Sequence, residues 1–174
     1  MSNDEHQPEF AADSGGSGNR RIRISAGAAE PGRGRPLILY KEAREEARQL
    51  GHNFVDTEHF LIALARYQED ISAKAMLAFG LNVNTLRSAA EEFAPASIDT
   101  CHGEMNITPQ ARSAQDGAWD EALKLQHVTV GPEHLLLAIL YQQVGIASRI
   151  LDASALDRKE LRTQIFKLMR VGNQ

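Results

Sequence analysis

The string Leu-Gly-His-Asn-Phe-Val-Asp-Thr-Glu-His at residues 50–59 is answered by Leu-Gln-His-Val-Thr-Val-Gly-Pro-Glu-His at residues 125–134. When this register is extended outward without a gap, Ala43–Arg87 and Ala118–Arg162 are identical at 16 of 45 positions. Unrelated segments of ordinary composition would agree at roughly one position in fifteen. The chain therefore contains an internal duplication, and we expect both copies to fold in the same way.

The spacing of apolar residues is helical from Leu37 onward. It predicts four helices in the first copy, a linker over residues 95–107, and the same four helices in the second copy. No segment in this part has the composition of a β-rich region. The expected helices cover residues 37–50, 57–67, 71–79 and 83–93, and then 109–125, 132–142, 146–152 and 158–170.

The second helix of each copy is apolar on almost every side, over residues 60–65 and 135–140. Such a helix must be buried on more than one face, and a single unit of four helices is too small to cover it. We expect the two units, residues 37–94 and 108–170, to dock through a pseudo-twofold axis. The predicted fold is therefore all-α, a single eight-helix domain with a seam where a ligand groove could form.

The start of each second helix is marked by the alignment of Pro132 with Thr57, because proline is favoured at the first helical position. This makes Asp56 and Gly131 the N-caps. The next residue in each copy is a glutamate, which the helix dipole stabilises there by about 0.3–1 kcal/mol. These two glutamates therefore have a structural explanation that needs no ligand.

The histidines of the doubled string also suggest a metal site. Against this, Glu58 and His59 are neighbours on a helix and point about 100° apart, and there is no His-Glu-x-x-His pattern. His52 and His127 end the first helices, where we expect them to satisfy C-terminal carbonyls. We expect no metal, and a small metal-dependent hydrolase that uses the His/Glu clusters stays as an alternative.

Residues 1–36 hold six of the 13 glycines and three of the six prolines, with few large apolar side chains. A segment of this kind cannot bury enough surface to order itself, so we expect a disordered tail. Within it, Arg-Arg-Ile-Arg-Ile at residues 20–24 alternates like a short strand that could pair with a partner. A scaffold whose basic tail contacts a polyanion is a further alternative.

The remaining features exclude several classes of function. A net charge of −4 and a pI near 5.9 give no general attraction for nucleic acid or acidic membranes. There is no Gly-Lys dipeptide for a P-loop and no Gly-x-Ser-x-Gly elbow, so we expect no ATP, no cofactor and no enzymatic activity. The single Cys101 and the lack of a signal peptide or membrane segment favour the cytoplasm.

The pattern Glu-Glu-Ala-x-x-Leu-Gly-His-Asn-x-Val-x-Thr-Glu-His-x-Leu-x-Ala-Leu from Glu45, followed by Ile-x-Ala-x-x-Met-Leu from Ile71, resembles the Clp repeat. Two such repeats form the N-terminal domain of the Clp/Hsp100 AAA+ unfoldases, and the similarity is greatest to the ClpC type. The resemblance covers roughly residues 36–170. It implies a domain that recruits substrate proteins, degrons and adaptors, here as a stand-alone adaptor or decoy without the ATPase rings.

In ClpC-type domains of some bacteria each repeat carries a pocket for phosphorylated arginine, with a glutamate on the guanidinium and a threonine on the phosphate. The resemblance carries the glutamates over to Glu58 and Glu133 and the second threonine to Thr108. The first threonine position falls on Arg33, and Pro132 replaces Thr57 in the second copy. At most one intact pocket is expected, with Glu58, Glu133, Thr108 and Thr57 as candidate ligand-binding residues.

Overall fold

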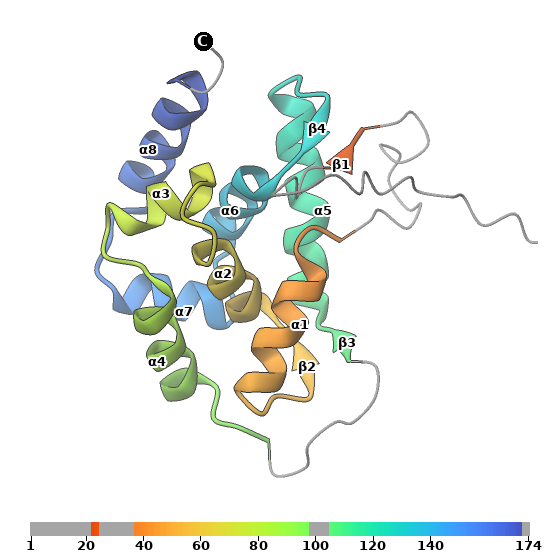
Figure 1. Ribbon diagram of the computed structural model, residues 1–174, viewed down its shortest axis with the longest axis vertical. Coiled ribbons are helices and arrows are strands. Elements are labelled where there is room, and N and C mark those ends of the chain that lie inside the picture. The colour runs from red at the N-terminus through yellow and green to blue at the C-terminus, as the bar shows by residue number, and fades with distance from the viewer. Residues whose placement is uncertain (1–21, 25–36, 98–104, 172–174) are drawn as a thin grey trace, which may run out of the picture.

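The computed structural model describes residues 22–24, 37–97 and 105–171 of the 174. Two series of four helices follow each other along the chain, as expected (Figure 1). The helices of the first repeat are α1 (Tyr40–Gln49), α2 (Thr57–Ala65), α3 (Ile71–Leu77) and α4 (Val83–Phe93). Those of the second repeat are α5 (Pro109–Lys124), α6 (Pro132–Tyr141), α7 (Ile146–Ala153) and α8 (Arg158–Val171). Cys101 and the expected tail, apart from residues 22–24, lie outside the described residues.

The expected helix starts are confirmed except at α1, where the predicted start at residue 37 is wrong. Leu39 has a left-handed backbone with φ 57°, which a helix cannot continue. Just before it, the backbone of Ile38 is fixed to Gln115 of α5: its N–H donates to Oε1 at 2.7 Å, and its carbonyl accepts from Nε2 at 2.8 Å. This long-range contact is not visible in the spacing of apolar residues, and it delays the helix to Tyr40.

The predicted N-caps are in place at the other helices. The side chains of Asp56, Asn82, Thr108 and Asp157 each accept a hydrogen bond from a backbone N–H in the first turn that follows. These bonds satisfy donors that a helix start leaves without an internal partner. Local capping chemistry therefore explains why the helices begin at matching positions in the two repeats.

The centre of the core is formed by α2 and α6. Figure 1 shows these two helices in the middle of the molecule, with α1 and α5 on one side of them and the other four helices on the opposite side. Eight of the nine residues of α2 and nine of the ten of α6 are buried. The prediction that the two apolar helices are buried between docked repeats is confirmed, and Trp119 is fully buried in the same core.

In the described part of the chain, four two-residue strands join segments that are far apart, and only the first of them was indicated by the sequence. β3 (Asn106–Ile107), just before the second repeat, pairs in parallel with β2 (Phe54–Val55) of the first repeat. β1 (Ile22–Arg23) pairs antiparallel with β4 (Thr129–Val130) of the second repeat. Within the strand-like stretch of the sequence, Ile22 and Arg23 thus have a strand partner in the chain itself. The β2–β3 pair brings the residue after it, Thr108, to the start of α2.

Among the described residues, no single helix is long and apolar enough to cross a membrane. Only α6 and α7 taken together have the required length and composition, and they are bent by 81° to each other.

Candidate functional site

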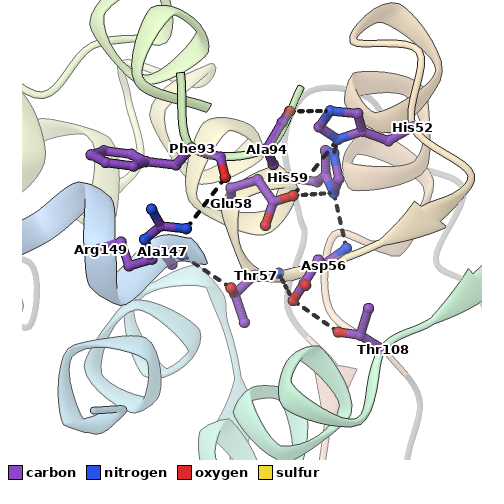
Figure 2. A network of polar contacts seen from close by, with 10 residues as sticks. All are labelled: His52, Asp56, Thr57, Glu58, His59, Phe93, Ala94, Thr108, Ala147 and Arg149. Atoms are coloured by element: carbon purple, nitrogen blue, oxygen red, sulfur yellow. Dashed lines mark hydrogen bonds and ion pairs between the residues drawn. The ribbon is translucent and has the colours of Figure 1, made fainter. Parts of the chain in front are cut away.

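A chain of hydrogen bonds runs through the two histidines of the first repeat (Figure 2). The backbone N–H of Asp56 donates to His59 Nδ1 at 2.9 Å, so that nitrogen carries no proton. His59 Nε2 must then donate to His52 Nδ1 at 2.7 Å, and His52 Nε2 in turn donates to the carbonyl of Ala94 at 2.7 Å. Both rings are therefore neutral, and they tie the end of α1 and the end of α4 to the start of α2.

The second repeat contains the same histidine pair. The N–H of Gly131 donates to His134 Nδ1 at 3.0 Å, and His134 Nε2 lies 2.8 Å from His127 Nδ1. This explains why the doubled string keeps two histidines seven residues apart. The expectation that His52 and His127 satisfy the carbonyls of their own helices is wrong: His52 reaches the carbonyl of Ala94 after α4, and the hydrogen bond of the His127 ring is to His134.

Each histidine pair and the adjacent glutamate form a cluster whose potential metal-binding atoms lie within 4.8 Å of one another. The donor chemistry does not fit a metal. Both nitrogens of His59 are used, one as acceptor from Asp56 and one as donor to His52, and His52 is likewise used at both nitrogens. A cation would have to break the bond that caps α2. The geometry therefore favours the structural role of the histidines.

Glu58 is the residue of this cluster that the fold leaves unsatisfied. Its side chain is 2% exposed, and its Oε2 atom is buried without a hydrogen-bond partner. Its Oε1 atom lies 3.7 Å from His52 Nδ1 and 3.6 Å from His59 Nδ1, but each of those nitrogens already accepts another hydrogen bond and has no proton to donate to the carboxyl. Burial, and then the negative charge of Asp56, raise the pKa of the Glu58 carboxyl to about 8. It is therefore protonated at neutral pH.

Burial has the opposite effect on the neighbouring imidazole. It lowers the pKa of His59 to about 3, with a smaller contribution from His52. This agrees with the neutral ring that the hydrogen bonds require.

The start of α2 is completed by residues of the second repeat. Thr108 Oγ1 donates to Asp56 Oδ1 at 2.8 Å, and the N–H of Ala147 in α7 donates to Thr57 Oγ1 at 3.2 Å (Figure 2). Gly145, with φ 103°, passes close by: a Cβ there would lie 3.2 Å from Thr57 Oγ1. Only glycine allows the second repeat to approach so closely with this backbone.

The structure thus gathers three of the four candidate residues, Thr57, Glu58 and Thr108, around the start of α2. Glu133 lies at the start of α6, where it is also buried, with Oε1 3.4 Å from His134 Nδ1. The resemblance paired Thr108 with Glu133, whereas in the structure the hydroxyl of Thr108 is bonded to Asp56, next to Glu58.

Sequence reasoning missed one exposed cation beside Glu58. Arg149 of α7 has its guanidinium carbon 4.7 Å from the centre of the Phe93 ring, and its Nη1 donates to the Phe93 carbonyl at 3.4 Å. Figure 2 shows Glu58 between this pair and the two histidines. The arginine and the phenylalanine are far apart in the chain, so no local pattern could have revealed their contact.

Comparison with known proteins places this fold. The family model described as "Clp repeat (R) N-terminal domain" matches the chain twice, over residues 38–112 and 106–174. The chain belongs to the Clp repeat family. Each match covers the four helices of one repeat, so the duplication in the sequence is a tandem pair of Clp repeats.

Relatives of this Clp repeat domain include large ATP-dependent proteins. It is 37% identical over 127 residues to an ATP-dependent Clp protease ATP-binding subunit ClpA homolog of Guillardia theta, covering 73% of this chain and 16% of that protein. It is 35% identical over 132 residues to the chloroplastic chaperone protein ClpC1 of Arabidopsis thaliana, covering 76% and 14%. The chain therefore spans only about a sixth or less of the length of these curated relatives.

Solved structures share the fold of the Clp repeat domain. The N-terminal domain of the chaperone ClpD from Arabidopsis thaliana matches with a TM-score of 0.64 and 19% identity, covering 84% of this chain and 97% of that one. The Hsp104 N-terminal domain from Candida albicans matches with a TM-score of 0.61 and 19% identity, covering 75% and 86%. Both confirm the all-α fold of two pseudosymmetric repeats.

Proposed function

We propose that this Clp repeat domain is a non-enzymatic protein-binding module of Clp-type protein quality control. It receives substrate proteins, degradation signals or adaptors that are destined for a Clp unfoldase. The family membership supports this function, because the relatives named above carry the matching domain in proteins described as Clp protease subunits and chaperones. The alternative of a metal-dependent hydrolase has little support, because hydrogen bonds occupy the histidine nitrogens that it needs.

The observation that carries the proposal is the unpartnered Oε2 of Glu58, buried at the seam between the repeats. A buried carboxyl without a partner is costly, and pairing with a guanidinium would remove that cost. Arg149, exposed on the adjacent helix, offers a positive charge for an anionic group attached to the same ligand. A phosphorylated arginine has both parts. We therefore propose phosphoarginine-marked protein segments as the ligand class, with Glu58 on the guanidinium and Arg149 on the phosphoryl group.

Binding requires Glu58 to become accessible and ionised. The Arg149–Phe93 contact beside it is held by a single long hydrogen bond of 3.4 Å and a cation–π contact, so it can open at small cost. Because the pKa of the free carboxyl is about 8, ligand binding below that pH must also release a proton. The affinity is therefore expected to increase about tenfold per pH unit between pH 6.5 and 7.5 and to level off above pH 8.

Calorimetric titration with phosphoarginine tests the site. We expect saturable heat with the wild type, loss of binding in Glu58→Gln, and retained binding in the matched variant Glu133→Gln, because the second repeat has Pro132 in place of Thr57. Arginine and inorganic phosphate serve as ligand controls. An absence of heat from the wild type at pH 8 would rule out phosphoarginine as the ligand.

The cellular role is tested by affinity capture from the native lysate, with Glu58→Gln as the control. Recovery of a Clp ATPase together with cargo supports an adaptor that delivers substrates. Recovery of marked or damaged proteins without the ATPase supports a decoy that sequesters them. Equal recovery by the wild type and the variant would contradict the role assigned to this site.

A further inference from the structure

The two repeats differ where their second, third and fourth helices meet. In the second repeat this place is filled by Arg158, the first residue of α8. Its Nη1 donates to the carbonyls of Leu140 and Gln142 at 3.3 and 2.7 Å. Its Nη2 donates to the carbonyl and hydroxyl of Ser148 at 3.0 and 2.8 Å and to Asp152 Oδ1 at 2.6 Å. The guanidinium thus satisfies carbonyls that the end of α6 leaves free.

The first repeat has Val83 at the matching position, 75 residues earlier, and here the structure has an open groove of about 410 Å³. The groove is lined by the counterparts of three of the four residues that hold Arg158, whereas Tyr67, the counterpart of Gln142, is not in the lining. Ala65 corresponds to Leu140, Ala73 to Ser148 and Leu77 to Asp152, and all three line the groove. The groove therefore lies at the place that the arginine side chain fills in the second repeat.

The surrounding framework is the same in both repeats. The side chains of Asn82 and Asp157 cap the fourth helices in the same way, accepting from the N–H two residues later at 3.0 and 2.7 Å. Since α2 ends at Ala65, its last carbonyls have no partner within the helix. One of them, Ala65, is the counterpart of Leu140, which binds the guanidinium in the second repeat. The carbonyl of Tyr67, the counterpart of Gln142, already accepts from the N–H of Asp70 at 2.8 Å.

We propose that this groove binds the side chain of an arginine presented by a partner protein. The guanidinium would donate to the carbonyls of Ala65 and Ala73, and its aliphatic stem would lie along Leu77, which is 56% exposed. The planar fork of arginine matches several divergent acceptors, whereas the compact ammonium of lysine does not. The one cation in the lining, Arg66, is engaged by Glu46 at 3.0 Å.

This groove is separate from the Glu58 site, because Glu58 lies at the start of α2 and the groove at its end. The ligand chemistry also differs. Carbonyl oxygens attract a guanidinium but repel a phosphoryl group, so the groove selects unmodified arginine. The two sites can therefore fail or succeed independently.

The test is a titration of the full chain with an acetylated and amidated Ala-Arg-Ala tripeptide. Binding is monitored by the NMR chemical shifts of the backbone amides of Leu77 and Val83. We expect saturable shifts at these amides with the arginine peptide and weaker ones with the lysine peptide. Peptides that carry citrulline or phosphoarginine should cause no shift at these groove amides, although phosphoarginine can still bind at Glu58. Glu58→Gln is expected to leave this binding unchanged. An absence of saturable shifts in the groove would overturn the proposal.

Two variants copy the second repeat into the first. Val83→Arg supplies the missing guanidinium in cis and should weaken peptide binding at least tenfold. Leu77→Asp supplies the counterpart of Asp152 on an exposed position and should tighten it about fivefold, as an exposed ion pair does. Leu123→Asp, at an exposed leucine of α5, is the matched control. Unchanged affinity in both groove variants, with the fold verified by circular dichroism, would contradict the proposal.

A last variant tests whether the chain's own tail occupies the groove. We expect that replacing Arg20, Arg21, Arg33 and Arg35 by glutamine leaves the NMR resonances of the Leu77 and Val83 amides at the positions they have in the wild type without peptide. A shift of these amides without peptide would assign the groove to the tail and overturn the assignment to a partner.

Discussion

Glu46 and Glu121 occupy the same place in the first helices of the two repeats, but they are held in different ways. Glu46 is fully buried, and two arginines approach it: Arg66 at 3.0 Å and Arg87 with two hydrogen bonds at 2.9 and 3.0 Å. Glu121 has Lys124 at 2.9 Å and, at 3.9 Å, Arg162. Each glutamate therefore has two cationic partners, but only Glu46 is hydrogen-bonded by two arginines.

One replacement explains the different position of the arginine. Tyr141 stands in the second repeat where Arg66 stands in the first, and Arg162 lies over its ring at 4.4 Å and over the Phe166 ring at 5.1 Å. An arginine that bonds a carboxylate in one repeat thus packs on aromatic rings in the other. The fold depends on filling this position between the helices, and it accepts ionic or aromatic chemistry there.

The largest expected effect distinguishes these two arrangements. Arg87→Met removes two hydrogen bonds from a buried carboxylate and should lower the free energy of unfolding by about 2–3 kcal/mol. The loss is smaller than for a fully buried ion pair, because Arg66 still binds the carboxylate and the side chain of Arg87 is partly exposed. Arg162→Met loses mainly the cation–π contacts, about 1 kcal/mol. Urea denaturation of both variants measures this, and equal losses would contradict the comparison.

An intermediate effect is expected from the carboxyl of Glu58. Its pKa is raised in the folded protein, so the unfolded chain loses this proton first, and stability falls as pH rises from about 4.5 to 8. His59 has a lowered pKa, so its contribution is lost as pH falls from about 6.5 towards 3. The two slopes oppose each other between pH 4.5 and 6.5. Above that range the contribution of Glu58 should fall steadily, by about 1 kcal/mol per pH unit, until pH 8 is approached.

Glu58→Gln keeps the shape of the side chain and replaces the titrating carboxyl with an amide that stays neutral at every pH of the experiment. Thermal or urea unfolding at pH 6.5 and 8 should show that this variant lacks the loss seen in the wild type, whereas Glu133→Gln serves as the matched change in the second repeat. A wild-type stability that does not change over this range would show that the carboxyl is ionised in the folded protein.

The smallest expected effect concerns the histidine pairs. The ring of His52 bonds both His59 and the carbonyl of Ala94, whereas among the described residues the ring of His127 bonds His134 alone. His52→Ala should therefore cost about 1 kcal/mol more than His127→Ala, the net value of one hydrogen bond. Urea unfolding at pH 7 compares them, and a larger loss in the second repeat would reverse the interpretation.

The elements that could be predicted from the sequence are those fixed locally. Thr108 followed by proline, and Asn82 before an apolar series, specify helix starts through neighbouring residues, and the structure has them there. The predicted start of α1 is wrong because the observed start depends on the hydrogen bonds between Ile38 and Gln115, which is 77 residues away in the sequence. The candidate site follows the same rule: the doubled string placed Glu58 at a helix start, but its contact with the seam depends on packing between repeats.

Arg149 and Arg158 show why the remaining functional features were missed. In the sequence, each is an ordinary charged residue of a predicted helix. Its role depends on carbonyls or rings that only the fold brings near it. The open groove in the first repeat has no sequence signal of its own. The groove is defined by the difference in space between Val83 in the first repeat and Arg158 at the matching position of the second.

The pairing of β3 with β2, with Thr108 bonded to the cap of α2, makes the start of the first repeat's central helix depend on the segment that opens the second repeat. The first repeat alone would lack both the strand partner and the bond to Asp56. If the backbone were cut between residues 97 and 105, the fragments should reassociate and fold together rather than separately.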